Sequence, residues 1–394
     1  MEASDVREPG LSIGVEEEFL LVDAESRRCV PRAEQVLAGS GRHRWHESGG
    51  GFHAELSTAQ VEAATGVCED LADLRPQLRY GRARLTRVAR TCGARPVSVG
   101  TPVLDAPSPP ITRGERFAAI EALYGDIVAD YQASGCHVHV GVPDRETAVA
   151  VVNHLRPWLP TLLALSVNSP FDHGRLTGYA SRRMTQIVRF PGAGVPPFAA
   201  SAAEYDTRVA ALVEAGVLAD EAMTFWLARP SPRWPTVEVR VADAAATADE
   251  TVLHAALVRG LVRTALVDLA AGREARDVDA QVCAAGLWNA ARHGMDGPGL
   301  DPFTHRAVPA WRLLDDLVAH VRPALADLGD LDAVRALVEG VRREGTGAAR
   351  QRRTAGRYGA RAVVDMLADQ TELGGLIVAA ADSFTRDPGH SEQV

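Results

Sequence analysis

The chain has 394 residues, 46% of them hydrophobic, a formal net charge of −9 and five cysteines. This length predicts one large domain or two to three smaller ones with a sizeable core, and the lack of a basic block argues against nucleic-acid partners. The cysteines form no CxxC pair, no apolar run reaches about 18 residues, and the first ten residues are polar, so we expect a cytoplasmic protein without a membrane span or signal peptide.

The first strongly patterned segment is SIGVEEEF, residues 12–19, inside an expected strand over residues 11–23. Successive side chains of a strand point to opposite faces. Glu16 and Glu18 therefore share one face, and Glu17 lies on the other. Two carboxylates on a face that apolar neighbours favour burying require an explanation, because a buried carboxylate is costly unless it is paired or binds a metal.

The next segment, FHAELSTAQVEA at residues 52–63, mixes strand-like and polar character and adds two more acids, Glu55 and Glu62. A polar loop that enters a helix is the simpler explanation of this segment alone. Apolar residues at helical spacing then predict an amphipathic helix over residues 69–92.

The remaining elements alternate between short strands and longer helices. We expect strands at residues 95–101, 136–142 and 236–243, helices at 114–132 and from Asp144 past Trp158 with a break at Pro157 and Pro160, a polar loop from Asn168 into a helix, and mainly helix in the last 150 residues. Isolated strands separated by long helices and loops predict a mixed α and β protein.

Three of the expected strands repeat the pattern of two polar residues at positions i and i+2, roughly 7 Å apart on one face. The pairs are Glu16 with Glu18, His137 with His139, and Glu238 with Arg240. A charged, solvent-exposed strand face explains any one pair. Three pairs on otherwise apolar strands favour a different arrangement, in which the strands share a sheet and the polar faces converge on one cavity.

The candidate ligands are mainly hard oxygen donors with one imidazole: Glu16, Glu18, Glu55, Glu62, Glu238 and His137. This set suits Mg²⁺ or Mn²⁺, whereas zinc takes more His or Cys and no HExxH motif is present. Five carboxylates exceed what one Mg²⁺ needs, so the inventory predicts two or three ions.

Arginines accompany these acids in the sequence. Arg240 lies two residues after Glu238, and Arg182 and Arg183 follow a glycine-containing loop. Planar guanidinium groups bind phosphate oxygens in a bidentate manner, and metal ions next to them favour nucleotide phosphates as ligands. The chain contains neither GxxxxGK[ST] nor GxGxxG, which excludes a P-loop or Rossmann interpretation.

Six segments in this order carry a family resemblance: SIGVEEEF, ELSTAQVE, GCHVHVGVPD, SPFDHGRLTGYASRR, RPSPRWPTVEVRVADA and GTGAARQRR. Together, over about residues 11–375, they resemble the bacterial carboxylate–amine ligase branch of the type 2 glutamate–cysteine ligase family. The resemblance implies an α+β fold similar to the glutamine synthetase catalytic domain, in which a curved antiparallel sheet cups the active site and helices pack on its outer face. We expect one catalytic domain over 11–375, with flexible termini at 1–10 and 376–394.

The resemblance also implies roles for the metal ligands. Glu18, Glu55 and Glu62 match the ligands of one ion beside the substrate carboxylate, and Glu16, His137 and Glu238 match the ligands of a second ion on the ATP phosphates. The interval from Glu55 to Glu62 is seven residues, one shorter than in glutamine synthetase.

Four further residues acquire roles by the same comparison. His139 resembles a residue that lines the nucleotide site, and Arg240 resembles the arginine that holds the transferred phosphoryl group. Arg182 and Arg183 match contacts to phosphate or substrate, and of these two Arg182 is the candidate catalytic residue and Arg183 the candidate nucleotide contact.

The activity implied is ATP-dependent formation of an amide through an acyl phosphate, from the γ-carboxylate of glutamate and an amine such as cysteine. Two alternatives remain open at this stage: a phosphotransferase on the same scaffold that releases a stable phosphorylated product, and a catalytically silent ATP-binding protein. The expected partners are small carboxylate and amine substrates, with no nucleic acid and no membrane, and a homodimer is the expected assembly.

Overall fold

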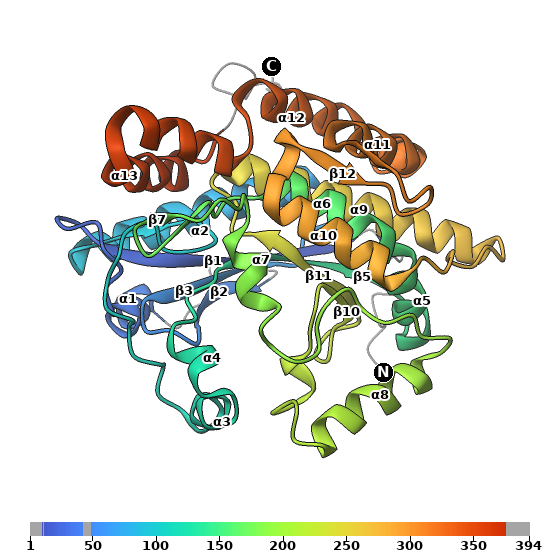
Figure 1. Cartoon of the computed structure of the whole chain (residues 1–394), viewed down its shortest axis with the longest axis horizontal. Helices are drawn as coiled ribbons and strands as arrows, with labels where there is room; N and C mark the ends of the chain where they lie inside the picture. The colour runs from blue at the N-terminus through green and yellow to red at the C-terminus, as the bar shows by residue number, and fades with distance from the viewer. Residues whose placement is uncertain (1–9, 11, 42–48, 376–394) are drawn as a thin grey trace, which may run out of the picture.

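A computed structural model describes residues 10, 12–41 and 49–375 of the chain (Figure 1). The expected flexible termini, 1–10 and 376–394, lie outside the described residues except for residue 10. No helix among the described residues is long and apolar enough to cross a membrane.

The centre of the fold is a seven-stranded sheet within the described residues, in the order β10-β11-β5-β1-β3-β2, with β4 paired to β1 as well. Every neighbouring pair in it is antiparallel. The strands are β1 (Ile13–Asp23), β2 (Gly49–Ala54), β3 (Gln60–Gly66), β4 (Ala94–Val97), β5 (Gly135–Gly141), β10 (Ala228–Pro230) and β11 (Thr236–Asp243).

Helices cover one face of this sheet and leave much of the other open, as Figure 1 shows. The covering layers are α2 (Leu71–Thr91), α5 (Arg145–Leu155), α6 (Leu159–Ser166), α9 (Ala248–Ala270), α10 (Ala280–His293), α11 (Ala310–Asp327), α12 (Leu331–Glu344) and α13 (Gly347–Leu373). The largest apolar cluster lies between them and the sheet, and its strand residues include Val15, Val138 and Val239.

Smaller elements connect and flank these layers. They are α1 (Ala33–Ser40), α3 (Glu115–Tyr124), α4 (Asp126–Ala129), α7 (Arg182–Ile187) and α8 (Ala202–Glu214), the 3₁₀ turns Arg156–Trp158, Glu221–Met223 and Gly294–Asp296, and the short pairs β6 (Phe171–Asp172) with β7 (Arg175–Leu176), β8 (Ala193–Gly194) with β9 (Phe225–Trp226), and β12 (Pro298–Leu300) with β13 (Ala307–Pro309). In Figure 1, α3 and α4 lie on one side of the opening and α7 and α8 on the other.

Local chemistry explains where the predicted helices begin and break. The Asp144 carboxylate accepts a hydrogen bond from the Thr147 amide at 2.7 Å and caps α5, and Pro157 lies in the 3₁₀ turn that separates α5 from α6. The helix expected over residues 114–132 is two helices, because Gly125 adopts a φ of 50° between α3 and α4. The expected α+β class, an open antiparallel sheet with helices on its outer face, is confirmed.

Glu17, the middle acid of the triplet, points to the covered face of β1. It forms a buried ion pair with Arg82 of α2, whose Nη2 lies 2.6 Å and whose Nε lies 3.1 Å from the two Glu17 carboxylate oxygens. The Thr251 hydroxyl donates a third hydrogen bond to Glu17, and Arg82 also donates to the carbonyl groups of Ala245 and Ala246. This fully bonded pair ties the central strand to α2 and α9.

We predict that Arg82→Met strongly destabilises the protein. Removal of one partner from a buried ion pair leaves an uncompensated charge, which costs about 3–5 kcal/mol. Urea denaturation measures the loss. Arg90→Met on the same helix is the control, because the Arg90 pair with Glu372 is exposed and such pairs contribute about 1 kcal/mol or less. Equal unfolding midpoints for the two variants would contradict this role of Arg82.

Candidate active site on the open face of the sheet

The register of the sheet brings the polar residues of four neighbouring strands together. The directly opposed pairs are Glu16 with His137, Glu18 with Glu62, and Glu238 with His139. Opposed residues on one face have Cβ atoms about 5 Å apart. Five residues of the three i, i+2 pairs therefore form one continuous polar patch with Glu62. We call this patch the acidic cluster: Glu16, Glu18, Glu62, His137, His139 and Glu238.

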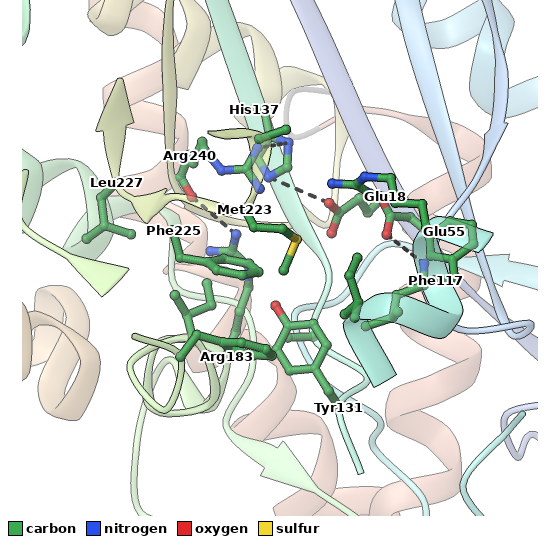
Figure 2. A pocket seen from close by; sticks show the side chains of 17 residues that line it. Glu18, Glu55, Phe117, Tyr131, His137, Arg183, Met223, Phe225, Leu227 and Arg240 are labelled. Atoms are coloured by element: carbon green, nitrogen blue, oxygen red, sulfur yellow. Dashed lines mark hydrogen bonds and ion pairs between the residues drawn. The ribbon is translucent and has the colours of Figure 1, made fainter. Parts of the chain in front are cut away.

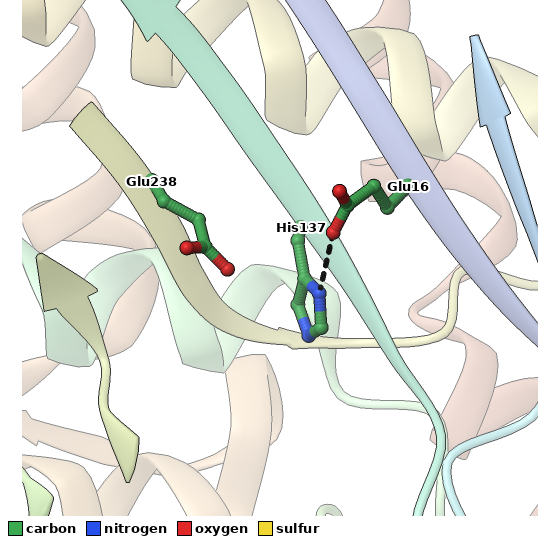
Figure 3. A group of neighbouring side chains, drawn as sticks. All are labelled: Glu16, His137 and Glu238. Carbon is green, nitrogen blue, oxygen red and sulfur yellow. Dashed lines mark hydrogen bonds and ion pairs between the residues drawn. The ribbon is translucent and has the colours of Figure 1, made fainter. Parts of the chain in front are cut away.

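The first group of candidate metal ligands comes from three strands. Glu16 of β1, His137 of β5 and Glu238 of β11 each offer an atom, and these atoms all lie within 4.8 Å of one another (Figure 3). Nδ1 of His137 lies 3.3 Å from a Glu16 oxygen. His139 supports the same group, since its Nε2 lies 3.5 Å from the other Glu16 oxygen and its Nδ1 lies 2.9 Å from the Thr236 hydroxyl.

The second group shares the same imidazole. Glu18, Glu62 and His137 offer atoms that again lie within 4.8 Å of one another. Nε2 of His137 lies 3.6 Å from Glu18, so the two ring nitrogens of His137 face different groups. The Gly135 amide donates to Glu18 at 2.5 Å, which fixes the carboxylate at the entry to β5.

Two arginines balance the acids at one end of the cluster. Arg229 of β10 donates to Glu238 from Nε at 2.8 Å and from Nη2 at 3.3 Å, and Arg240 contacts Glu238 and, at 3.2 Å, His137. Arg240 lies where the register between β11 and β5 shifts. Such an irregularity redirects side chains, and it leaves Arg240 half-buried beside the cluster.

Burial and mutual repulsion disfavour the charged form of three acids. Burial, with the nearby charge of Glu55, raises the pKa of Glu18 to about 8. Burial and the charges of Glu16, Glu55 and Glu18 raise the pKa of Glu62 well above its usual value, and burial also raises the pKa of Glu55. Glu18 in particular lacks the positive charge that it would need to ionise fully at neutral pH.

The other members of the cluster have the opposite balance. Burial opposes the charge of Glu16 and of Glu238, but the imidazoles of His137 and His139 next to Glu16, and the charges of Arg240 and Arg229 beside Glu238, hold both pKa values well below the usual range. Burial and Arg240 lower the pKa of His137 to about 4. His137 is therefore neutral at pH 7, the form in which an imidazole binds a metal.

These residues fit a divalent cation. Among the described residues, the buried Nε2 atoms of His137 and His139 have no hydrogen-bond partner, and a buried polar atom without a partner is uncommon unless it serves a ligand. An ion between Glu18, Glu62 and His137 would supply the missing positive charge. Carboxylates with one neutral imidazole form a donor set that suits Mg²⁺ or Mn²⁺.

Glu55 and Arg182 lie outside both groups. Glu55 is close enough to raise the pKa of Glu18, but in the structure its carboxylate accepts a hydrogen bond from the Leu56 amide at 2.8 Å. Arg182 forms an ion pair with Asp172 at 2.9 Å and donates to Thr185, and it is not among the residues that line the cleft described below.

Arg183 is buried under the cluster. Its guanidinium donates to the carbonyl groups of Arg240 at 3.1 Å and Val241 at 3.4 Å, so it holds the backbone at the irregular part of β11. A side chain at Gly135 would overlap the Arg183 guanidinium, which explains the glycine at the start of the HxH strand.

A cleft adjoins the acidic cluster on the Glu18 side (Figure 2). One half is polar, with Glu18, Glu55, His137, Arg183 and Arg240. The other half is mainly apolar, with side chains from α3 and from the segments around α7 and β9, and it also includes Arg116 of α3. The sequence patterns gave no indication of this apolar half, or of the role of Arg229, because both depend on long-range contacts.

The open antiparallel sheet and its acidic cluster are the features expected of a carboxylate–amine ligase fold. The sequence profile of glutamate–cysteine ligase family 2 matches residues 12–372. The chain therefore belongs to glutamate–cysteine ligase family 2, which confirms the resemblance and the expectation of a glutamate–cysteine-ligase-like enzyme.

Individual relatives agree with this assignment. The chain is 54% identical over 365 residues to a protein of Saccharopolyspora erythraea that carries the name glutamate–cysteine ligase 2-2, with 93% of each chain covered. It is 45% identical over 363 residues to a glutamate–cysteine ligase 2 by name in Salinispora arenicola, covering 92% of this chain and 95% of that protein.

Solved structures share the fold at low sequence identity. The Francisella tularensis glutamate–cysteine ligase in complex with AMP superposes with a TM-score of 0.69 at 15% identity, covering 95% of this chain and 91% of that one. A bifunctional glutathione synthetase from Pasteurella multocida gives a TM-score of 0.67 at 14% identity, covering 92% of this chain and 52% of that one.

We predict that Glu18→Gln stabilises the protein at pH 8 in the presence of a chelator. The folded protein holds the Glu18 proton up to about pH 8, whereas an unfolded chain loses it near the usual value of 4.5. Stability therefore falls as pH rises through this window. The neutral amide avoids that loss, by on the order of 2 kcal/mol.

Urea denaturation at pH 5 and pH 8 measures this difference. The gain should shrink toward pH 5, where Glu18 is protonated in the folded wild type. Glu339→Gln is the control, since Glu339 is an exposed carboxylate on α12. A Glu18→Gln variant that is less stable than the wild type at pH 8 would contradict the electrostatic account of Glu18.

Proposed function

We propose that this protein is an ATP-dependent carboxylate–amine ligase, which joins the γ-carboxylate of glutamate to an amine through an acyl phosphate. The observation that carries the proposal is the pair of ligand groups around His137, next to Arg240, on the open face of the sheet. Family membership and the names of the relatives support the same reaction class. Residues 11–375 act as one catalytic domain, because strands from Ile13 to Asp243 build the sheet and α13 ends at Leu373.

The chain would hold two or three Mg²⁺ or Mn²⁺ ions in the acidic cluster. Glu16, His137 and Glu238 are the proposed ligands of the ion on the nucleotide side, and Glu18 and Glu62, with Glu55 after a change of its side-chain position, are those on the substrate side. When bound, the ions neutralise the phosphate oxygens and the substrate carboxylate, which otherwise repel one another. His139 orients Glu16 and borders the nucleotide.

Arg240 is the proposed contact to the transferred phosphoryl group. Its hydrogen bonds to described residues all come from Nη1, which leaves Nε and Nη2 for an anion. Preorganised positive charge where negative charge develops is usually the largest single contribution to catalysis. Arg183 is a positioning residue here, because its bonds to the Arg240 and Val241 carbonyl groups hold the segment that presents Arg240.

The reaction has two steps. A substrate carboxylate oxygen attacks the γ-phosphorus of ATP, the bond from that phosphorus to the β-phosphate bridging oxygen breaks, and ADP leaves. The neutral amine nitrogen then attacks the acyl carbon, the carbon–oxygen bond to phosphate breaks, and the nitrogen loses one proton as the amide forms. Arg240 is placed to offset charge in the first step and to hold the departing phosphate in the second.

Product analysis tests the proposal directly. Purified protein with ATP, Mg²⁺ and glutamate is assayed for ADP and free phosphate, with and without a panel of amines that includes cysteine. We expect release of both products that depends on the amine, and an acyl hydroxamate when hydroxylamine replaces the amine. ADP with a stable phosphorylated acid would instead identify a phosphotransferase, and no ATP turnover with any amine would refute the ligase.

We predict that Arg240→Lys lowers kcat by at least about 100-fold and changes the KM for ATP much less. Lysine keeps the charge but loses the planar fork, and loss of one such donor at a developing charge costs roughly 10²–10³ in rate. Steady-state kinetics measures both constants.

Arg182→Lys is the matched comparison for this experiment. The Arg182 guanidinium is bonded to Asp172 and Thr185, and the sequence prediction that it contacts phosphate or substrate requires a loss of rate in this variant too. Unchanged turnover in Arg240→Lys would remove Arg240 from the phosphoryl site.

A further inference from the structure

The apolar half of the cleft has no role in the reaction scheme above. Its side chains come from three separate segments: Phe117 and Ile120 of α3, Ile187 and Phe190 at and after α7, and Met223 and Phe225 before and in β9. We call these six side chains the apolar wall; they line the cleft together with Glu18 and Arg240, and Figure 2 labels Phe117, Met223 and Phe225 among them. An apolar ligand that covers these side chains would bind favourably, because apolar surface that is removed from water lowers the free energy of the complex.

Packed aromatic rings make the wall rigid. The Phe190 ring stacks on Phe225 with 4.6 Å between ring centroids, and Tyr131 and Tyr124 meet Phe190 edge to face at 5.0 Å and 5.3 Å. Rings held on several sides cannot swing away to admit a polar group. The shape of the apolar half is therefore preformed for an apolar ligand.

The position of the wall places it on the substrate side of the cluster. Glu18 and Glu55 of the proposed substrate side border the cleft, together with Arg240 and His137, the imidazole that both ligand groups share, whereas Glu16, His139 and Glu238 do not. The molecule that covers the wall is therefore the carboxylate or the amine. Glutamate carries an α-ammonium and an α-carboxylate. The Arg116 guanidinium on this side is already paired with Asp220, so either charge would lie against Phe117 and Phe225 at a high desolvation cost.

The chemistry of the second step favours the amine. The attacking nitrogen must be neutral, and an apolar environment disfavours the ammonium form. Two polar side chains of the lining belong to this side: Arg116, whose guanidinium is bonded to Asp220 at 3.0 Å, and Tyr131, whose hydroxyl points into the cleft in Figure 2. Burial raises the pKa of Tyr131, so it stays a neutral phenol that can accept from, or donate to, an amine nitrogen.

On the basis of the proposed ligase function, we infer that the amine substrate is a primary amine with a large apolar body, of the arylalkyl or branched-alkyl class, rather than cysteine. The apolar body covers the wall of Phe117, Met223 and Phe225, and the nitrogen lies toward Tyr131 and the acyl carbon. The wall thus selects the amine and also favours its reactive form.

An amine panel with the wild-type enzyme is the first test. We expect kcat/KM for phenethylamine and phenylalanine to exceed that for methylamine and cysteine by about tenfold or more, since each methylene in an apolar pocket contributes 10–200-fold. The comparison of phenethylamine with phenylalanine shows whether the amine also carries a carboxylate. A preference for cysteine or methylamine would overturn the inference while leaving the ligase intact, and hydroxamate formation with hydroxylamine reports the ligase independently.

Calorimetric binding of phenethylamine and methylamine in the presence of ADP and Mg²⁺ is a second measurement that does not depend on the acid. We expect phenethylamine to bind at least about tenfold more tightly. Equal affinities would overturn the inference even if no acid tested supports turnover.

Phe117 is the most informative position for mutation, because it is half-buried on α3 and lies outside the ring stack. Phe117→Ala should lower kcat/KM for phenethylamine about tenfold and leave the values for methylamine and ATP unchanged. Phe117→Leu, which keeps an apolar surface and the helix, should restore most of the loss. Tyr358→Ala, which removes an exposed ring from α13, is the control and should change neither value.

The kinetic constants of the Phe117→Ala variant show whether the amine or the adenine of ATP contacts the apolar wall. A raised KM for ATP in Phe117→Ala with unchanged amine kinetics would place the adenine there and overturn the inference. An equal loss of kcat/KM with every amine would also overturn the inference, because Phe117 would then support only the fold. A loss confined to the large apolar amines supports it.

Discussion

The main physical constraint on this structure is the electrostatic repulsion between carboxylates that are gathered around one imidazole. Glu16, Glu18, Glu62 and Glu238 come from three strands and surround His137 on one face of the sheet. Arg229 and Arg240 compensate the Glu238 end, whereas the Glu18 end has too little positive charge, as its raised pKa indicates. Strained or repulsive groups of this kind are typical of functional sites.

The central strand β1 contributes side chains to both faces of the sheet, the open face with the acidic cluster and the face that the helices cover. Glu16 and Glu18 point to the open face, and Glu17 points to the covered face and pairs with Arg82. One three-residue run thus supplies two candidate metal ligands and the anchor that holds them in place. Because β1 pairs with β3, β4 and β5, its position fixes where Glu62 and His137 can lie.

The sequence predicts the faces of the strands but not their order. Alternation along a strand is local, so Glu16 with Glu18, and His137 with His139, could be assigned to common faces from the sequence alone. The pairing of Glu18 with Glu62 required the register of β1 against β3, and no local pattern specifies a register between distant strands. The family resemblance supplied the grouping of ligands that physical reasoning about the residues left open.

For the cleft beside the acidic cluster, the sequence predicts even less. Phe117, Phe190 and Phe225 lie in segments without periodicity in common, and they meet only because α3 and the chain after α7 border the same opening. Arg229 precedes a proline and looks like a loop residue in the sequence, yet it is directly opposite Glu238. The break at Gly125 between α3 and α4 depends on a positive φ, which the surrounding helical pattern concealed.

A crystal structure with Mn²⁺ and a non-hydrolysable ATP analogue is the most direct test of the central claim. Anomalous scattering locates each manganese without assumptions about its ligands. The account predicts one ion held by Glu16, His137 and Glu238 against the phosphates, and a second held by Glu18 and Glu62 beside the cleft. Manganese bound elsewhere on the protein, or a triphosphate that lies away from the acidic cluster, would contradict it.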